Sequence, residues 1–138
     1  MTALLLDSVI LIDHFNGVTA ATEYLRQNWT SASVSVITRA EVLTGFQVHR
    51  ETLAKQLLDR FPTLPAAADD ADLAAALRRR YRRKLPDVLQ AAIAVNHRLK
   101  LATRKHLLNL GQGLRSGPPF VCGHSLFANV KSCRAERR

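Results

Sequence analysis

Short apolar runs alternate with segments of helical periodicity along most of the chain. Residues 3–6 form an apolar run typical of a buried strand, and residues 8–15 (SVILIDHF) have the spacing of an amphipathic helix. The apolar positions on one face of this helix are Val9, Ile10, Ile12 and Phe15. Residues 19–29 predict a second helix, and the alternating residues 33–37 (SVSVI) predict a second buried strand.

The middle of the chain has one long helical pattern bounded by prolines. Residues 38–61 predict a helix with an irregularity at Gly45, which Pro62 and Pro65 end. Further on, residues 69–84 begin with acids and end with bases, as the dipole of a helix favours.

The last elements that the sequence predicts are a helix and two strands. Residues 85–98 predict a helix, residues 99–103 (LKLAT) a strand, and residues 119–122 (PFVC) a final strand. Strands that alternate with helices favour an α/β fold, a doubly wound domain whose central parallel sheet is flanked by helices. A chain of 138 residues has room for one such domain. We expect it to cover residues 1–130, followed by a basic C-terminal tail over residues 131–138.

Composition excludes several classes of protein. No apolar run approaches the roughly 20 residues that span a bilayer, and no basic segment precedes the apolar N-terminus, so we expect a cytoplasmic protein without a membrane segment. Cys122 and Cys133 form no CxxC pair, which argues against a zinc site.

Charge indicates a polyanionic partner. The formal net charge is +9, and residues 88–138 carry nine basic side chains but only one acid, Glu136. Lysine and arginine gain affinity by displacing counterions from phosphates. The alternative is a basic surface that serves solubility alone. A cluster of bases also surrounds Tyr81, where guanidinium groups would meet RNA phosphates and the ring would stack on a base, unless the cluster is only a solvated helix end. Its members are Arg78, Arg79, Arg80, Arg82, Arg83 and Lys84.

Three carboxylates are candidates for chemistry. Asp7 and Glu41 each follow a predicted strand, and Asp87 opens a predicted helix, so all three are expected at the ends of elements. Ligands of open α/β sheets bind beyond the carboxyl ends of the strands. Carboxylates gathered there would repel one another unless a cation lay between them, and oxygen ligands select a hard ion such as Mg²⁺.

Each acid also has a structural interpretation. Asp7 or Ser8 would cap the helix that follows, and Thr38 with Glu41 matches the pattern of a capping box. Asp87 lies in a predicted first helical turn, where the helix dipole favours an acid. Position alone therefore does not distinguish a metal site from three helix ends.

The sequence motifs around the three acids are more specific evidence than their positions. LLLDSVILID, SVITRAEVLTGF, KLPDVLQAAIAV and LKLATR follow in this order, and together they resemble the PIN-domain toxins of virulence-associated-protein C (VapC) type over residues 3–104. The resemblance implies a PIN-like fold in which Asp7, Glu41 and Asp87 hold Mg²⁺ or Mn²⁺. It also implies an endoribonuclease, the toxin of a toxin–antitoxin pair, that hydrolyses RNA phosphodiesters with a metal-activated water.

The same resemblance implies partners and weaker RNA contacts. A cognate antitoxin would block the acidic pocket, and two copies of the chain would form a homodimer. Thr103 is the hydroxyl residue of the fourth motif, and we expect it to contact RNA together with Arg79, Arg80 and Arg83.

The fourth motif departs from the family pattern. The family usually places Asp or Asn after the hydroxyl and basic residues, whereas this chain has Lys105, with Asn109 a turn further on. This departure leaves open a catalytically degenerate PIN domain that binds RNA or an antitoxin without cleavage. Because Asp7 follows a predicted strand, a receiver-like or phosphatase-like domain that takes up phosphoryl groups on Asp7 also stays open.

Overall fold

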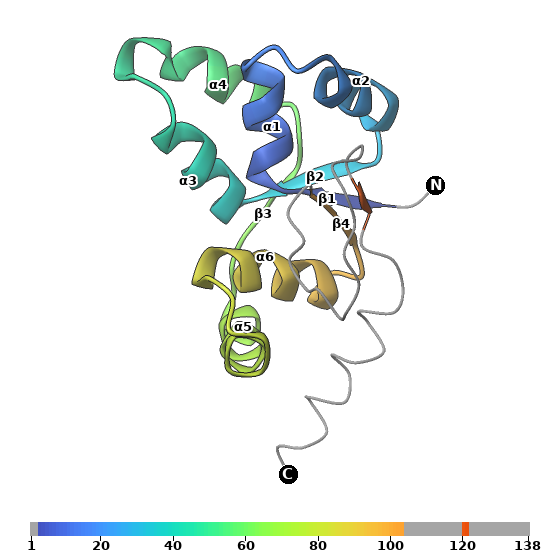
Figure 1. Ribbon diagram of the computed structural model, residues 1–138, viewed down its shortest axis with the longest axis vertical. Coiled ribbons are helices and arrows are strands. Elements are labelled where there is room, and N and C mark those ends of the chain that lie inside the picture. The colour runs from blue at the N-terminus through green and yellow to red at the C-terminus, as the bar shows by residue number, and fades with distance from the viewer. Residues whose placement is uncertain (1–2, 104–119, 122–138) are drawn as a thin grey trace.

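The computed structural model describes residues 3–103 and the backbone of residues 120–121. A central sheet lies between two layers of helices (Figure 1). The strands are β1 (Leu4–Leu6), β2 (Ala32–Ser35), β3 (Thr63–Leu64), β4 (Lys100–Thr103) and β5 (Phe120–Val121). The helices are α1 (Ser8–Phe15), α2 (Thr19–Asn28), α3 (Val36–Thr44), the 3-10 helix η1 (Val48–Arg50), α4 (Glu51–Leu58), α5 (Ala68–Tyr81) and α6 (Leu85–Asn96).

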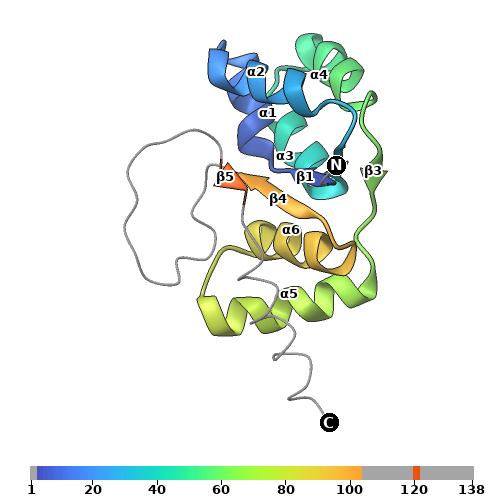
Figure 2. The same cartoon turned by 90° about the vertical axis from the view of Figure 1, so that its right-hand side faces the viewer.

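The sheet has the order β3-β2-β1-β4-β5. The first four strands are parallel, which confirms the predicted α/β fold with a parallel sheet, and β5 pairs antiparallel with β4. Helices α1 to α4 cover one face of the sheet, whereas α5 and α6 cover the other (Figure 2). No helix within residues 3–103 is both long and apolar enough to cross a membrane.

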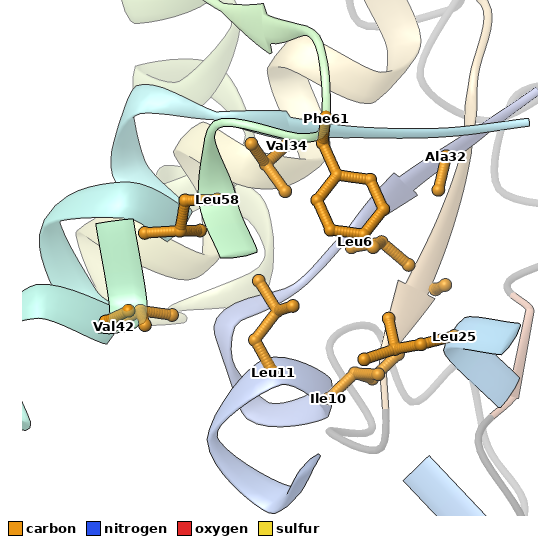
Figure 3. Packing of buried hydrophobic residues seen from close by; sticks show 11 residues of the cluster. Leu6, Ile10, Leu11, Leu25, Ala32, Val34, Val42, Leu58 and Phe61 are labelled. Carbon is orange, nitrogen blue, oxygen red and sulfur yellow. The ribbon is translucent and has the colours of Figure 1, made fainter. Parts of the chain in front are cut away.

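The alternation of side chains along the central strands separates two apolar cores. Leu5 and its β4 neighbour Leu101 pack with α5 and α6, whereas Leu6 and its neighbour Ala102 pack with α1 to α4. Successive residues of a strand point to opposite faces of the sheet, so one strand serves both layers. Figure 3 shows the second of these cores around Leu6.

Helix α1 is buried on a wider face than the sequence predicted. Ile10 and Leu11 are fully buried, whereas three of the four predicted core positions are only half-buried: Val9, Ile12 and Phe15. The reason is that α1 contacts β4, α2 and α3, so it is enclosed from several sides.

The predicted boundary between the second strand and its helix was wrong. Strand β2 ends at Ser35, because the Ser35 hydroxyl oxygen accepts a hydrogen bond from the Thr38 backbone N–H at 3.1 Å and caps α3. Val36 and Ile37 therefore form the first helical turn. The single helix predicted over residues 38–61 is also wrong, because α3 ends at Thr44 with Gly45 as its C-cap and α4 begins only at Glu51.

Three smaller differences from the prediction concern one short strand and the ends of two helices. Strand β3 was not predicted, since it has two residues and lies between two prolines at the edge of the parallel strands. Helix α5 ends at Tyr81 rather than at residue 84, because Arg82 adopts a left-handed conformation with φ 51°. Helix α6 ends at Asn96, two residues before the predicted end. The tail over residues 131–138, Lys105, Asn109 and both cysteines lie outside the described residues.

Candidate active site

Asp7 lies where β1 passes into α1, and its side chain is 1% exposed. Its Oδ1 accepts a hydrogen bond from the Ser8 backbone N–H at 2.8 Å, which caps α1 as the structural interpretation predicted. Its Oδ2 accepts a hydrogen bond from the Thr103 hydroxyl at 2.6 Å. Both carboxylate oxygens are therefore held in one orientation at the carboxyl end of the sheet's central strand.

Thr103 is buried beside Asp7. It ends β4, the neighbour of β1, and it is 1% exposed. Its hydroxyl donates to Asp7, and the Asp7 backbone N–H donates to the Ala102 carbonyl at 2.9 Å. This hydrogen bond helps to fix the orientation of the Asp7 carboxylate. A contact of Thr103 with RNA stays a prediction.

Within residues 3–103, the groups that donate to the Asp7 carboxylate are neutral. They are the Ser8 backbone N–H, the Ser8 hydroxyl and the Thr103 hydroxyl. Among residues 3–103, no Lys, Arg or His forms an ion pair with Asp7. An ionised carboxylate that is buried among neutral groups is stabilised by a nearby cation, so this arrangement suits a bound metal ion.

Glu41 lies within α3 and is half-buried. The sequence placed it at the end of an element, which is wrong because β2 ends six residues earlier, at Ser35. The predicted capping box of Thr38 and Glu41 is also wrong, since Ser35 is the N-cap and Glu41 stands in the second turn. The main structural alternative for this acid is therefore removed.

Asp87 lies in the first turn of α6, as predicted, and is half-buried. The N-cap residue Lys84 makes no side-chain capping hydrogen bond. An acid in this turn interacts favourably with the helix dipole, so the structural interpretation of Asp87 still holds.

The elements that carry the three acids meet at one end of the sheet. Helix α1 leaves β1, α3 leaves β2 and α6 begins on the same side (Figure 1), and α3 contacts both α1 and α6. Within the described ranges, however, no three His, Cys, Asp or Glu side chains lie close enough together to hold a metal ion. Mg²⁺ commonly takes one or two protein carboxylates and keeps several waters, so oxygen donors of this kind fit a partly hydrated ion.

A buried polar network between the acids was not predicted. The Thr38 hydroxyl donates to the Leu6 carbonyl at 2.9 Å, and the Gln90 amide donates to the Thr38 hydroxyl oxygen. The Ser35 hydroxyl donates to Gln90 Oε1 at 2.5 Å. Gln90 lies in the otherwise apolar helix segment VLQAAIAV, and this polar residue at a core position was the available sequence signal.

The predicted RNA-binding bases lie at the end of α5. Arg79 and Arg80 are exposed, and Arg83, just beyond the helix, is half-buried. The Arg80 guanidinium carbon lies 5.5 Å from the centroid of the Tyr81 ring. The two exposed guanidinium groups are accessible to a polyanion.

Comparisons with known proteins agree on one family. The sequence matches the PIN domain family over residues 4–105. It is 37% identical over 130 residues to "Ribonuclease VapC10" of Mycobacterium tuberculosis, from strains CDC 1551 / Oshkosh and ATCC 25618 / H37Rv, which covers 88% of this chain and 96% of the relative.

Solved structures with a similar fold include the following two. A toxin–antitoxin complex from Klebsiella pneumoniae contains a chain with 36% identity and a TM-score of 0.68, covering 75% of this chain and 87% of that one. VapBC2 from Rickettsia felis, bound to a DNA fragment from its promoter, has a TM-score of 0.65 and covers 75% of this chain and 88% of its own. Its identity is 17%, so this second likeness concerns the fold alone.

Proposed function

The chain belongs to the PIN domain family, and from this premise we propose that it is a metal-dependent endoribonuclease, the toxin of a toxin–antitoxin pair. The observation that carries the proposal is the burial and hydrogen bonding of the Asp7 carboxylate. Its carboxylate is buried at the carboxyl end of β1, both oxygens are fixed by neutral donors, and no base within residues 3–103 pairs with it. The ribonuclease relative supports the activity, and the Klebsiella complex supports the place in a toxin–antitoxin pair.

The three acids have separate roles in this proposal. Asp7 and Asp87 would hold Mg²⁺ or Mn²⁺, and Glu41 would orient the attacking water or hold a second ion. When bound, the divalent ion activates water for attack on phosphorus and offsets charge on the phosphate oxygens. Thr103 keeps the Asp7 carboxylate in position through the hydrogen bond to Oδ2. No serine, cysteine or histidine nucleophile is required.

The proposed partners follow from the same relatives. A cognate antitoxin would bind this chain and block the acids, since the similar Klebsiella structure is a complex of a toxin with an antitoxin. A homodimer remains a prediction, and so does the cytoplasm as the place of action, where cellular RNA is available.

The test of the function is cleavage of a labelled circular RNA, which has no ends and so reports internal cuts only. With Mg²⁺ or Mn²⁺ the purified protein should linearise the circle. Excess chelator should stop the reaction, and added Mn²⁺ should restore it. Cleavage that persists in chelator would exclude the metal mechanism.

One further candidate is binding without cleavage. It is favoured by Lys105, which stands where the family usually has Asp or Asn, and by the lack of a three-donor metal group in the described part of the chain. RNA affinity that is unaffected by chelator, together with no cleavage of the circular RNA in either metal, would establish this alternative.

The arginine cluster gives a separate prediction about RNA binding. Replacing Arg79, Arg80 and Arg83 together with glutamine should weaken binding to RNAs of any sequence. It should also reduce the slope of log affinity against log salt by about 2, since each phosphate contact to a single strand contributes about 0.7. Binding measured by fluorescence anisotropy between low and physiological salt decides this.

A matched variant controls for net charge. Arg26, Arg50 and Arg60 are exposed and lie outside the predicted cluster, so glutamine at all three removes the same charge elsewhere. This control should retain most of the slope. Equal slopes for the two triple variants would assign Arg79, Arg80 and Arg83 to an ordinary solvated surface.

A further inference from the structure

We propose that Thr38 and Gln90 are positioning residues that set the spacing of the three carboxylates. The inference rests on the proposed function, because it concerns the metal that these carboxylates would hold. Thr38 is fully buried, Gln90 is 1% exposed, and the two side chains are hydrogen-bonded to each other. The mechanism assigns neither of them a contact with RNA or metal.

Thr38 connects the first two acids. Its hydroxyl donates to the carbonyl of Leu6, the residue directly before Asp7. It also precedes Glu41 by three positions in α3, and residues at this spacing are neighbours on one face of a helix. A single hydroxyl thus fixes the end of β1 relative to the helix turn that carries Glu41.

Gln90 connects the third acid to this pair. It follows Asp87 by three positions in α6, and its amide N–H donates to the Thr38 hydroxyl oxygen. Its Oε1 accepts from Ser35, which in turn caps α3 through the Thr38 backbone N–H. Ser35, Gln90 and Thr38 are thus joined in a ring of three hydrogen bonds, two between side chains and the third from the Thr38 backbone N–H to the Ser35 hydroxyl oxygen.

The network adds a polar connection between the two helical layers. Helices α3 and α6 lie on opposite faces of the sheet, each with its own apolar core, and Ile37 of α3 also packs against the core on the α6 side. Apolar packing is not directional, whereas a satisfied hydrogen-bond loop permits few arrangements. Glu41 comes from one layer and Asp87 from the other. The network joins the helices that carry these two acids, and it ends at the carbonyl of Leu6, next to Asp7.

The experiment measures Mn²⁺ affinity without RNA, by electron paramagnetic resonance of free Mn²⁺, for Thr38→Val and Gln90→Met. Both changes keep the side-chain size but remove the network bonds. Mn²⁺ affinity should fall about 10–100-fold, as it does when groups that orient metal ligands are removed. Thr38→Ser, which keeps the hydroxyl, should bind Mn²⁺ nearly as the wild type does.

Asn96→Leu is the matched control. Asn96 donates to Asp70 at 2.7 Å and joins α6 to α5 by a partly buried hydrogen bond. It lies nine residues from Asp87, about 13 Å along the helix. This variant should lower the melting temperature but leave Mn²⁺ affinity unchanged. Circular dichroism identifies any variant that does not fold, and the remaining one of Thr38→Val and Gln90→Met then decides.

The outcomes separate the two proposals. A wild-type protein that binds no Mn²⁺ would overturn the proposed function itself. If the wild type binds Mn²⁺ and the folded network variants bind it within about twofold of the wild type, the positioning role is wrong. It is also wrong if Asn96→Leu loses as much affinity as they do, because the loss would then reflect general loosening of α6.

Discussion

The Asp7→Asn variant is expected to lose RNA cleavage by about a thousandfold or more and to melt close to the wild type. The metal supplies several kcal/mol of charge stabilisation in the transition state, and each 1.4 kcal/mol is about tenfold in rate. An amide removes the negative charge that attracts the ion. It keeps an oxygen that accepts from the Ser8 backbone N–H, so the cap of α1 survives.

The fold tolerates this change because the second contact can reverse. The Thr103 hydroxyl now donates to Asp7 Oδ2, and in the variant it would accept from the asparagine amide instead. Asp59→Asn, on the surface beside Arg39, is the control and should cleave normally. Cleavage rates and thermal melting are measured on the same preparations. An Asp7→Asn protein that melts normally and cuts RNA at the wild-type rate would show that Asp7 holds no essential metal.

The Glu41→Gln variant is the second change with a large expected effect. Cleavage should fall at least about 100-fold, since loss of this charge removes either a metal ligand or the group that orients water. Stability should change little, because Ser35 caps α3 and Glu41 has no part in that cap. Asp87→Asn would be less informative, because the charge of Asp87 also stabilises the first turn of α6.

Glu51→Gln is the control for this second prediction. Glu51 lies in the first turn of α4 and pairs with Lys55 at 2.7 Å on the surface. Its loss should leave cleavage unchanged and alter stability by less than about 1 kcal/mol. Wild-type cleavage by Glu41→Gln would remove Glu41 from the site. A drop in melting temperature that matches the loss of activity would assign it a structural role.

Local signals were sufficient to predict the elements that carry Asp7 and Asp87. The apolar run before Asp7, the helical periodicity after it, and the Leu-Pro-Asp start of α6 each depend on neighbours in the sequence. Glu41 was misplaced because the β-branched residues Val36 and Ile37 suit a strand, whereas the Ser35 cap starts a helix there.

The network was beyond sequence reasoning for a different reason. Ser35 and Thr38 lie 55 and 52 positions from Gln90, and no periodicity relates residues so far apart. The hydrogen bond from Thr103 to Asp7 was missed likewise, since the two residues lie 96 positions apart. A polar residue in an apolar helix indicates that a partner exists, but only the packed layers identify that partner.

The central claim is that Asp7, Glu41 and Asp87 form one divalent-metal site, and a crystal structure of the protein soaked in Mn²⁺ tests it most directly. The anomalous density of Mn²⁺ locates the ion without reference to activity. We expect a peak beside the carboxylates of Asp7 and Asp87, with Glu41 facing it either directly or through water. The absence of a peak there at saturating Mn²⁺, or a peak at other residues alone, would contradict the account.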